Sequence, residues 1–386
     1  MKTKEYFGYV KKSYKFKNYV AYIGVIIFTV VSAVLAYMGY LPRSTQNLFT
    51  QIGYSIILAV SLNLVVGFLG ELSLGHAGFM CVGAYLGCFL ANYLHTIIPS
   101  KLAVLIISMI AGGLVAAVFG FIIGLPALRL KGDYLAIVTL AFGEIVRTIF
   151  KNQKVFGGAL GLTTKKYGTT LFIVAFVVVL IMIFVIQNLV KSKHGRAITA
   201  IRDNEIAAKA MGINVTYYKL FVFVISAFFA GIAGVIYGHY ATPVLYSFFS
   251  YNYSIEILVM VVLGSMGSIN GSIIAAALIT FINFQLTTKL SGDLAALKNL
   301  IYALILIAIV IVNNAPALTA LKERFGIKSL VSKVISKFYK PKYDPSKRKD
   351  DEAYWHRIPT KIQMDELLSM DVKPDTTYTP DKREEK

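Results

Sequence analysis

Charged residues are scarce in this chain. Asp, Glu, Lys and Arg make up 15% of its 386 residues, whereas hydrophobic residues make up 56%, and the mean hydropathy is +0.65. A soluble domain of this length needs many more charged side chains to cover its surface. The composition therefore excludes a soluble globular protein and predicts a polytopic membrane protein.

Cysteines and common catalytic motifs are rare or missing. Cys81 and Cys88 are seven residues apart in one apolar run, which favours packing positions over a disulfide or a metal site. The dipeptide Gly-Lys never occurs, so no Walker A phosphate loop is present, and neither is an HExxH motif or a nucleophile elbow. His76 and His239 lie among small residues and are predicted to be hydrogen-bonded core histidines rather than proton relays. We expect no enzyme activity, cofactor or metal in this chain.

Positive charge is abundant by contrast, because the formal net charge is +19. The basic residues gather at the ends of apolar runs, where they set membrane orientation rather than bind nucleic acid. Six lysines precede the first apolar run, so the N-terminus is expected in the cytoplasm. An even number of crossings then brings the basic C-terminal tail to the same side of the cell membrane.

Apolar runs fill most of the chain. A helix needs about 20 apolar residues to cross a hydrocarbon core of about 30 Å. The runs therefore predict an all-α membrane protein with roughly 8–10 transmembrane helices, some short or broken. Candidate spans are 19–40, 50–70, 73–95, 101–128, 134–150, 169–190, 217–240, 254–268, 271–290 and 296–313. The spans 134–150 and 254–268 are short. The lysines that follow the first of these two fall outside the cell unless 134–150 is re-entrant, namely Lys151, Lys154, Lys165 and Lys166.

The composition divides the chain into three parts. Residues 1–18 form a basic cytoplasmic segment, and residues 19–313 form the transmembrane domain. Beyond it, residues 314–386 are rich in Lys, Asp, Glu and Pro, which predicts a charged, partly disordered cytoplasmic tail.

Glycines interrupt or pack the apolar runs. Pairs spaced four residues apart predict close helix packing in lipid, namely Gly83/Gly87, Gly120/Gly124, Gly234/Gly238 and Gly267/Gly271. Glycine-rich patches at 67–70, 73–78 and 264–271 predict broken helices, which are tolerated where they line a cavity or are buried in protein. Both a transport pathway and ordinary packing are compatible with them.

Three acidic residues lie within or at the edge of apolar runs, where an ionised group needs a partner. Arg147 follows Glu144 by three residues on one helix face, which favours structural pairing over a direct role in a pathway. Glu71 occupies the break after Gly70, where a carboxylate can orient backbone amides. Glu256 lies near the start of its run and is expected at the membrane interface.

A polar, alanine-rich segment, residues 191–216, separates two long apolar runs. The pattern from Arg196 to Met211 predicts one short helix with a Glu205–Lys209 pair and a stop at Gly212. Such a helix is too short to span a bilayer. Its small side chains and flanking basic residues favour docking of a cytoplasmic protein over a solvated connector.

Four blocks of sequence, read together, carry a resemblance to a known family. They are SLNLVVGFLGELSLGHAGFMCVGAY (61–85), GLPALRLKGDYLAIVTLAFGEIVR (124–147), the block 195–240 that begins GRAITAIRDNEIAAKAMGINV, and SIEILVMVVLGSMGSINGSIIAAAL (254–278). In this order they resemble the permease subunit of branched-chain amino acid ABC transporters, the LivM type. The charged tail, the basic N-terminal extension and Glu71, where relatives often carry Gln, depart from that pattern.

The resemblance implies a permease domain that forms part of the path for branched-chain or other hydrophobic amino acids. It implies a second homologous permease, two ATPase subunits that bind ATP and Mg, and an extracellular solute-binding protein. By resemblance, the contact or shaping residues for the ATPases are Gly195, Arg196, Asp203, Asn204, Ala207, Ala208 and Gly212. The alternatives are a urea or amide permease of the same family, a secondary transporter coupled to ions through Glu144 or Glu256, and a membrane scaffold that works through its tail.

Overall fold

The computed structural model describes residues 22, 24–130, 132–289, 303–304 and 307. These residues all belong to the unit Met1–Asn314. The predicted basic segment 1–18, most of the predicted span 296–313 and the tail 314–386 lie outside the described residues.

The described part of the chain is helical, which confirms the all-α prediction, and its one β-bridge joins Leu162 to Val244. The α-helices are a short apolar helix Gly24–Tyr37, α2 Arg43–Asn63, α3 His76–Leu94, α4 Lys101–Ala127, α5 Asp133–Asn152, α6 Thr169–Lys191, α7 Lys193–Asp203, α8 Glu205–Ala210, α9 Val215–Tyr240, α10 Tyr251–Leu263 and α11 Ile269–Lys289. The π-helical turn η1, Leu64–Leu69, follows α2 directly. Three 3₁₀ turns lie in loops, namely η2 Lys154–Phe156, η3 Gly158–Leu160 and η4 Tyr246–Phe249.

Six of these helices are long and apolar enough to cross a membrane: α2 with η1, α3, α4, α6, α9 and α11. The first helix and α10 are apolar but shorter. The 20-residue helix α5 is not among the six, because Glu144, Arg147 and Lys151 interrupt its apolar face. It packs along the first half of α3: Gly143 lies against Gly78, and the Phe150 ring stacks on Tyr85 with centroids 4.6 Å apart.

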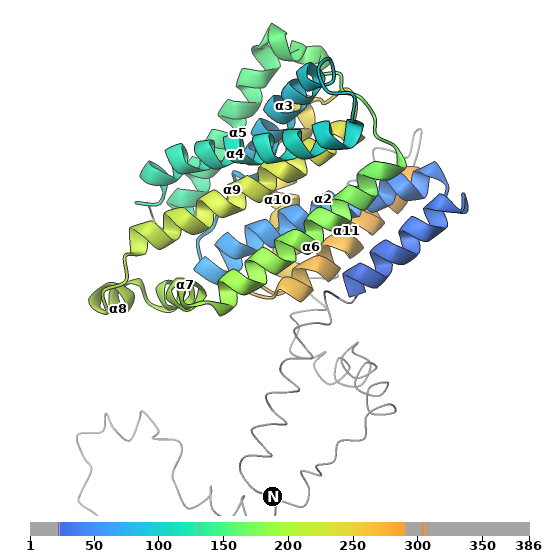
Figure 1. Ribbon diagram of the computed structural model, residues 1–386. Coiled ribbons are helices and arrows are strands. Elements are labelled where there is room, and N and C mark those ends of the chain that lie inside the picture. Colours follow the sequence, from blue (N-terminus) through green and yellow to red (C-terminus); the bar gives the residue numbers. More distant parts are fainter. Residues whose placement is uncertain (1–21, 23, 131, 290–302, 305–306, 308–386) are drawn as a thin grey trace, which may run out of the picture. The chain divides into compact units, whose positions relative to one another are not determined.

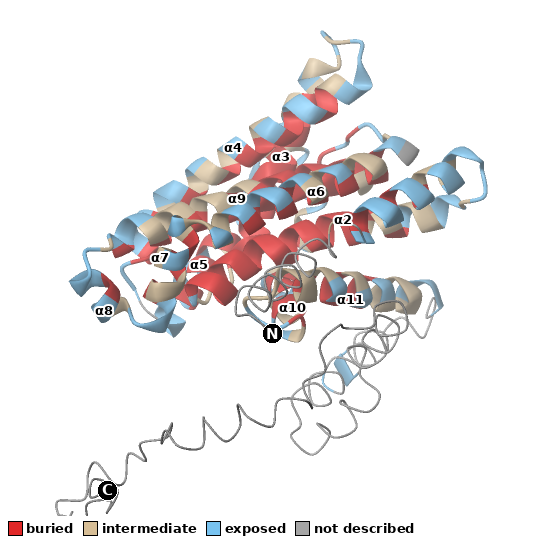
Figure 2. Cartoon of the chain, turned by 60° about the horizontal axis from the view of Figure 1, so that its bottom comes forward, coloured by how far each residue is buried: buried red, intermediate tan, exposed pale blue. Residues whose placement is uncertain are grey.

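The packing is built around α9, which lies against α2, α3 and α4 (Figure 1). Glycines permit these approaches: a Cβ on Gly83 would overlap the Gly231 backbone, and a Cβ on Gly234 would overlap the Met80 carbonyl. The prediction that small residues mediate helix packing is therefore confirmed for α3 and α9. Buried residues run through α2 and α9, whereas the outer faces of α4 and α6 are exposed (Figure 2). Those outer faces are apolar, as contact with lipid requires.

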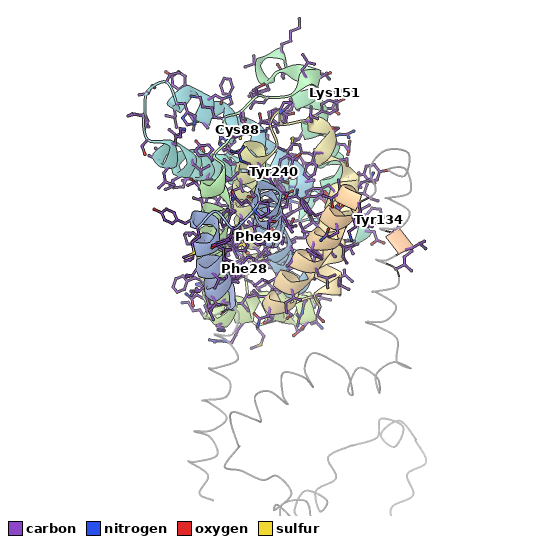
Figure 3. All side chains as sticks on the ribbon, turned by 90° about the vertical axis from the view of Figure 1, so that its right-hand side faces the viewer. Phe28, Phe49, Cys88, Tyr134, Lys151 and Tyr240 are labelled. Carbon is purple, nitrogen blue, oxygen red and sulfur yellow. The ribbon has the colours of Figure 1, made fainter. Side chains whose placement is uncertain are left out.

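The helices have two distinct ends. At one, the α7–α8 end, α6 finishes and α9 begins (Figure 1). At the opposite end α2 and α6 begin and α9 finishes. Lys151 lies there with its ammonium 5.3 Å from the centroid of the Tyr246 ring, and Figure 3 shows it beyond Tyr240 at that end. The lysines after 134–150 thus lie opposite the α7–α8 end, as the count of crossings predicts.

Candidate functional site at the α7–α8 end

The alanine-rich segment forms two helices, so the prediction of one helix over 196–211 is wrong. Ser192 caps α7 by accepting from the His194 and Gly195 N–H groups at 3.1 and 3.3 Å. Asn204 then adopts extended backbone and accepts from the N–H groups of the next turn at 3.0 Å. An Asn side chain that caps a helix start competes with the continuous helix, and this capping separates α7 from α8.

Two other predictions for this segment are confirmed. Gly212 has φ +80°, the left-handed conformation that ends a helix and that glycine adopts at least cost. The Glu205 and Lys209 side chains form the expected ion pair across one turn, with N···O 3.0 Å. The segment is therefore short and sharply bounded.

The segment presents apolar side chains away from the helix bundle. Ile206 is 78% exposed and Met211 is 82% exposed, and Ala207 beside them is exposed as well. Exposed apolar residues grouped on a rigid element are typical of a protein contact. We call this group of three the α8 face.

The residues that the resemblance indicated divide into two groups. Arg196, Asp203, Asn204, Ala207 and Gly212 are exposed. Gly195 and Ala208 are buried. A Cβ on Gly195 would overlap the carbonyl oxygen of Val190, which shows how tightly α7 folds back on the end of α6.

Arg202 joins α7 to the turn that follows α2. Its guanidinium donates to the Gly67 carbonyl in η1 at 3.2 Å and to the Asp203 carboxylate at 2.9 and 3.1 Å. A Cβ on Gly70 would lie 2.7 Å from Arg202 Cγ, so glycine is needed there. A displacement of α7 would therefore also displace η1, through the hydrogen bond from Arg202 to Gly67.

The two glycine-rich breaks at 67–70 and 264–271 pack against each other. The Asn63 amide donates to the Ser268 carbonyl at 3.1 Å and accepts from the Gly267 N–H at 2.9 Å. A Cβ on Gly67 would overlap both Asn63 and Gly267. These breaks therefore pack on each other beside α7, which favours the packing interpretation for them, although Gly70, Ser265 and Met266 are exposed.

Lys219 is the centre of an ion-pair network that the sequence reasoning missed. Its side chain is 4% exposed and contacts the carboxylates of Glu71 and Glu205, the latter at 3.3 Å. Glu205 also pairs with Lys209. The prediction that Glu71 orients backbone amides is thus corrected: its carboxylate meets an ammonium group from α9. The signal for Lys219 was a lone lysine in an apolar run, which requires a partner.

The remaining intramembrane candidates lie away from this network. Glu144 pairs with Arg147 at 2.8 Å and accepts from the Tyr251 N–H at 3.0 Å, which confirms structural pairing. His76 is 2% exposed and lies 2.9 Å from the Ser61 hydroxyl. Glu256 accepts from the Asn283 amide of α11 at 3.1 Å and is therefore more than an interfacial carboxylate.

A small polar cluster lies in the loops of the opposite end. His95 Nε2 is 2.8 Å from the Tyr167 hydroxyl. Burial, helped by the neighbouring Lys165 and Lys101, lowers the pKa of His95, and burial raises the pKa of Tyr167 to about 12. His239 is a core histidine as predicted, and its Nδ1 is 3.1 Å from the Lys165 carbonyl. Within the described ranges no group of three or more His, Cys, Asp or Glu residues is placed to hold a metal ion.

Comparison with protein families gives one matching family model. Residues 44–310 match the family described as the permease component of the branched-chain amino acid transport system. This range covers the described transmembrane helices from α2 onward and the whole α7–α8 segment. No solved structure matches the chain.

Several curated proteins resemble the chain. It is 36% identical over 275 residues to the high-affinity branched-chain amino acid transport system permease protein LivM of Salmonella typhimurium, covering 61% of this chain and 62% of that protein. The Escherichia coli LivM shows 36% identity over 271 residues with the same coverage. A probable LivM of Methanocaldococcus jannaschii shows 28% identity over 257 residues, covering 57% of this chain and 74% of the relative. The match thus spans 62% of the length of the two bacterial relatives.

Proposed function

Because the chain belongs to the family of branched-chain amino acid transport permease components, we propose that it is one membrane subunit of an ATP-driven importer for these amino acids. Its partners would be a second homologous permease, two ATPase subunits that hold ATP and Mg, and an extracellular solute-binding protein. The subunit lies in the cell membrane with its α7–α8 end in the cytoplasm. This chain itself catalyses no reaction.

The α8 face carries the docking part of the proposal. It is apolar, exposed and held on two short capped helices rather than on a loose loop. An ATPase subunit that buries Ile206 and Met211 would gain about 1.5–3 kcal/mol for each side chain fully buried. The basic residues around α7 agree with a cytoplasmic location.

The ion-pair network carries the coupling part. A docked ATPase that shifts α8 would displace Glu205, and Glu205 forms an ion pair with Lys219 near the start of α9. Arg202 transmits the same displacement to η1. Since α9 runs from this network to the opposite end, it would tilt as a rigid element and change access to the path.

A secondary transporter coupled to ions through Glu144 is disfavoured, because that carboxylate is occupied by Arg147 and by the Tyr251 N–H. A urea or amide importer remains within the same architecture. The solute is therefore assigned by relatedness to the LivM proteins and must be tested by transport.

Docking is tested by Ala207→Trp in the α8 face. We expect the bulky indole to abolish co-purification of the ATPase subunits while membrane insertion stays normal. The matched control is Ala159→Trp, at an exposed alanine in the loops of the opposite end, which should leave co-purification unchanged. Normal ATPase association and transport by Ala207→Trp would contradict the docking proposal.

A further inference from the structure

A cavity lined by both polar and aromatic side chains lies among α2, α9, α10 and α11, toward the end opposite α7 and α8. Its volume is about 210 Å³. At about 30 Å³ for each water-sized group, it has room for about seven such groups, which suits a small ligand and excludes a nucleotide or a peptide. Nothing in the coupling mechanism above uses it.

Glu256 of α10 gives the cavity a negative charge. Its carboxylate lines the cavity and accepts from the Asn283 amide of α11 at 3.1 Å. A carboxylate is an acceptor for the N–H groups of a ligand. An anionic group inside a membrane protein favours a cationic ligand that enters its cavity.

Aromatic rings form much of the remaining wall. The Tyr54 and Tyr237 rings are 5.6 Å apart and meet edge to face, and the Phe248 ring stacks on Tyr237 at 4.1 Å. Tyr253 packs on Phe248 with centroids 4.4 Å apart. Aromatic rings beside one carboxylate are a typical environment for an ammonium group, because a ring that lines the cavity can attract a cation through its quadrupole.

Thr280 of α11 supplies an unused polar atom. The residue is 6% exposed and lines the cavity, and its hydroxyl has no hydrogen-bond partner among the described residues. A buried hydroxyl without a partner is costly, and a ligand N–H would satisfy it. This buried, unpartnered group is independent evidence that the cavity accepts a hydrogen-bond donor.

We propose that this cavity binds the ammonium group of a small aliphatic amine, between the Glu256 carboxylate, the Thr280 hydroxyl and the aromatic rings. If the proposed transport function holds, on which this step rests, the ligand is the amino group of the transported amino acid. The apolar faces of Phe248 and Met260 would then contact its aliphatic side chain.

A neighbouring cavity of about 430 Å³ shares Tyr240 with the first and has the opposite charge. Arg43 and Lys166 line it. A bare ammonium ligand is therefore repelled from the second cavity, whereas the carboxylate of an amino acid is attracted toward it. The pair of cavities suits a zwitterion, and the first one selects the amine.

The test measures the rate at which a cationic methanethiosulfonate forms a mixed disulfide with Thr280→Cys in the full permease, releasing methanesulfinate, with 3-methylbutylamine, leucine or 4-methylpentanoate as competitor. The two amines should slow labelling about tenfold or more, the scale expected for one close charge pair, and the carboxylic acid should not. Glu256→Gln should remove this protection. Thr96→Cys, exposed at the opposite end, should be labelled without protection, and the native Cys81 and Cys88 are buried and give the background.

Ser55→Cys, on the α2 wall of the cavity, repeats the measurement should Thr280→Cys fail to fold. Equal protection by 4-methylpentanoate, or protection that survives Glu256→Gln, would overturn the inference.

The transport function and the amine cavity can be refuted independently of each other. Protection by 3-methylbutylamine in a protein that transports no amino acid would refute the transport function alone. Normal leucine uptake by a permease that keeps Glu256, in which neither amine slows labelling of the cavity cysteine, would refute the cavity alone.

Discussion

Lys219 is the residue that joins the α7–α8 segment to the transmembrane helices. Its ammonium is nearly inaccessible and lies between two carboxylates from different parts of the chain. Burying a charge is costly unless it is paired, so the three groups depend on one another. A change at any one of them leaves the others in an unfavourable environment.

Lys219→Met is expected to lower the free energy of unfolding by about 3–5 kcal/mol, because it leaves buried carboxylates without their cation. Adding Glu71→Gln should recover part of this loss, so the double variant loses less than the sum. The control is Lys209→Met, whose side chain is 59% exposed and whose loss should cost about 0–1 kcal/mol. Denaturant unfolding gives the free energy of unfolding of the unaltered permease and of these four variants, namely the two single variants, the double variant and the control, and strictly additive losses would contradict the network.

Pairs of side chains close in sequence were predictable, whereas pairs between distant parts of the chain were not. The Glu144–Arg147 and Glu205–Lys209 pairs follow from helical spacing alone. The partner of Glu71 lies in a different helix, and nothing in the local sequence of either residue indicates the other. Glu256 was assigned to the interface for the same reason, since its partner Asn283 belongs to α11.

Among the helices, α9 connects the ion-pair network around Lys219 with the proposed amine cavity. Lys219 lies in its first turns, and Tyr237 and Tyr240 near its end line the proposed amine cavity. Glycines along its length bring it against α3 and α4 without intervening side chains. This close packing lets α9 move only as a unit with its neighbours.

Gly234→Leu tests that packing, because any side chain there would overlap the Met80 carbonyl of α3. We expect a loss of about 1–3 kcal/mol or more in unfolding free energy and a fall in transport. Gly24→Ala is the control, since a Cβ on Gly24 has no atom within 4 Å, and it should be neutral or slightly stabilising. Thermal unfolding of both variants measures the effect. If the unfolding midpoint of Gly234→Leu equals that of Gly24→Ala, the packing role of Gly234 is refuted.

The elements themselves were largely predictable from the apolar runs, and their boundaries were less so. The break between α7 and α8 was missed although Asn204 followed by Glu205 is a common helix-start signal. Alanine-rich flanks favoured a continuous helix and outweighed that signal. The amine cavity was not predictable, because its wall is assembled from separate helices and the loop turn η4.

At the scale of the whole molecule, the family match ends at residue 310, before the charged tail. Removal of residues 340–386 should therefore leave transport and ATPase association close to those of the full chain. Uptake of radiolabelled leucine by cells that carry the truncated protein measures this. A truncated protein that inserts and assembles yet fails to transport would show that the tail is a working or regulatory element.

Transport through this permease is proposed to be coupled to ATP hydrolysis in partner subunits. The most direct measurement is ATPase activity and uptake by the complete complex in proteoliposomes with its binding protein, across leucine, isoleucine, valine, urea and other neutral amino acids. We predict that the three branched-chain amino acids stimulate hydrolysis and accumulate only with ATP. Uptake without ATP, or a permease with which no ATPase co-purifies, would contradict the account.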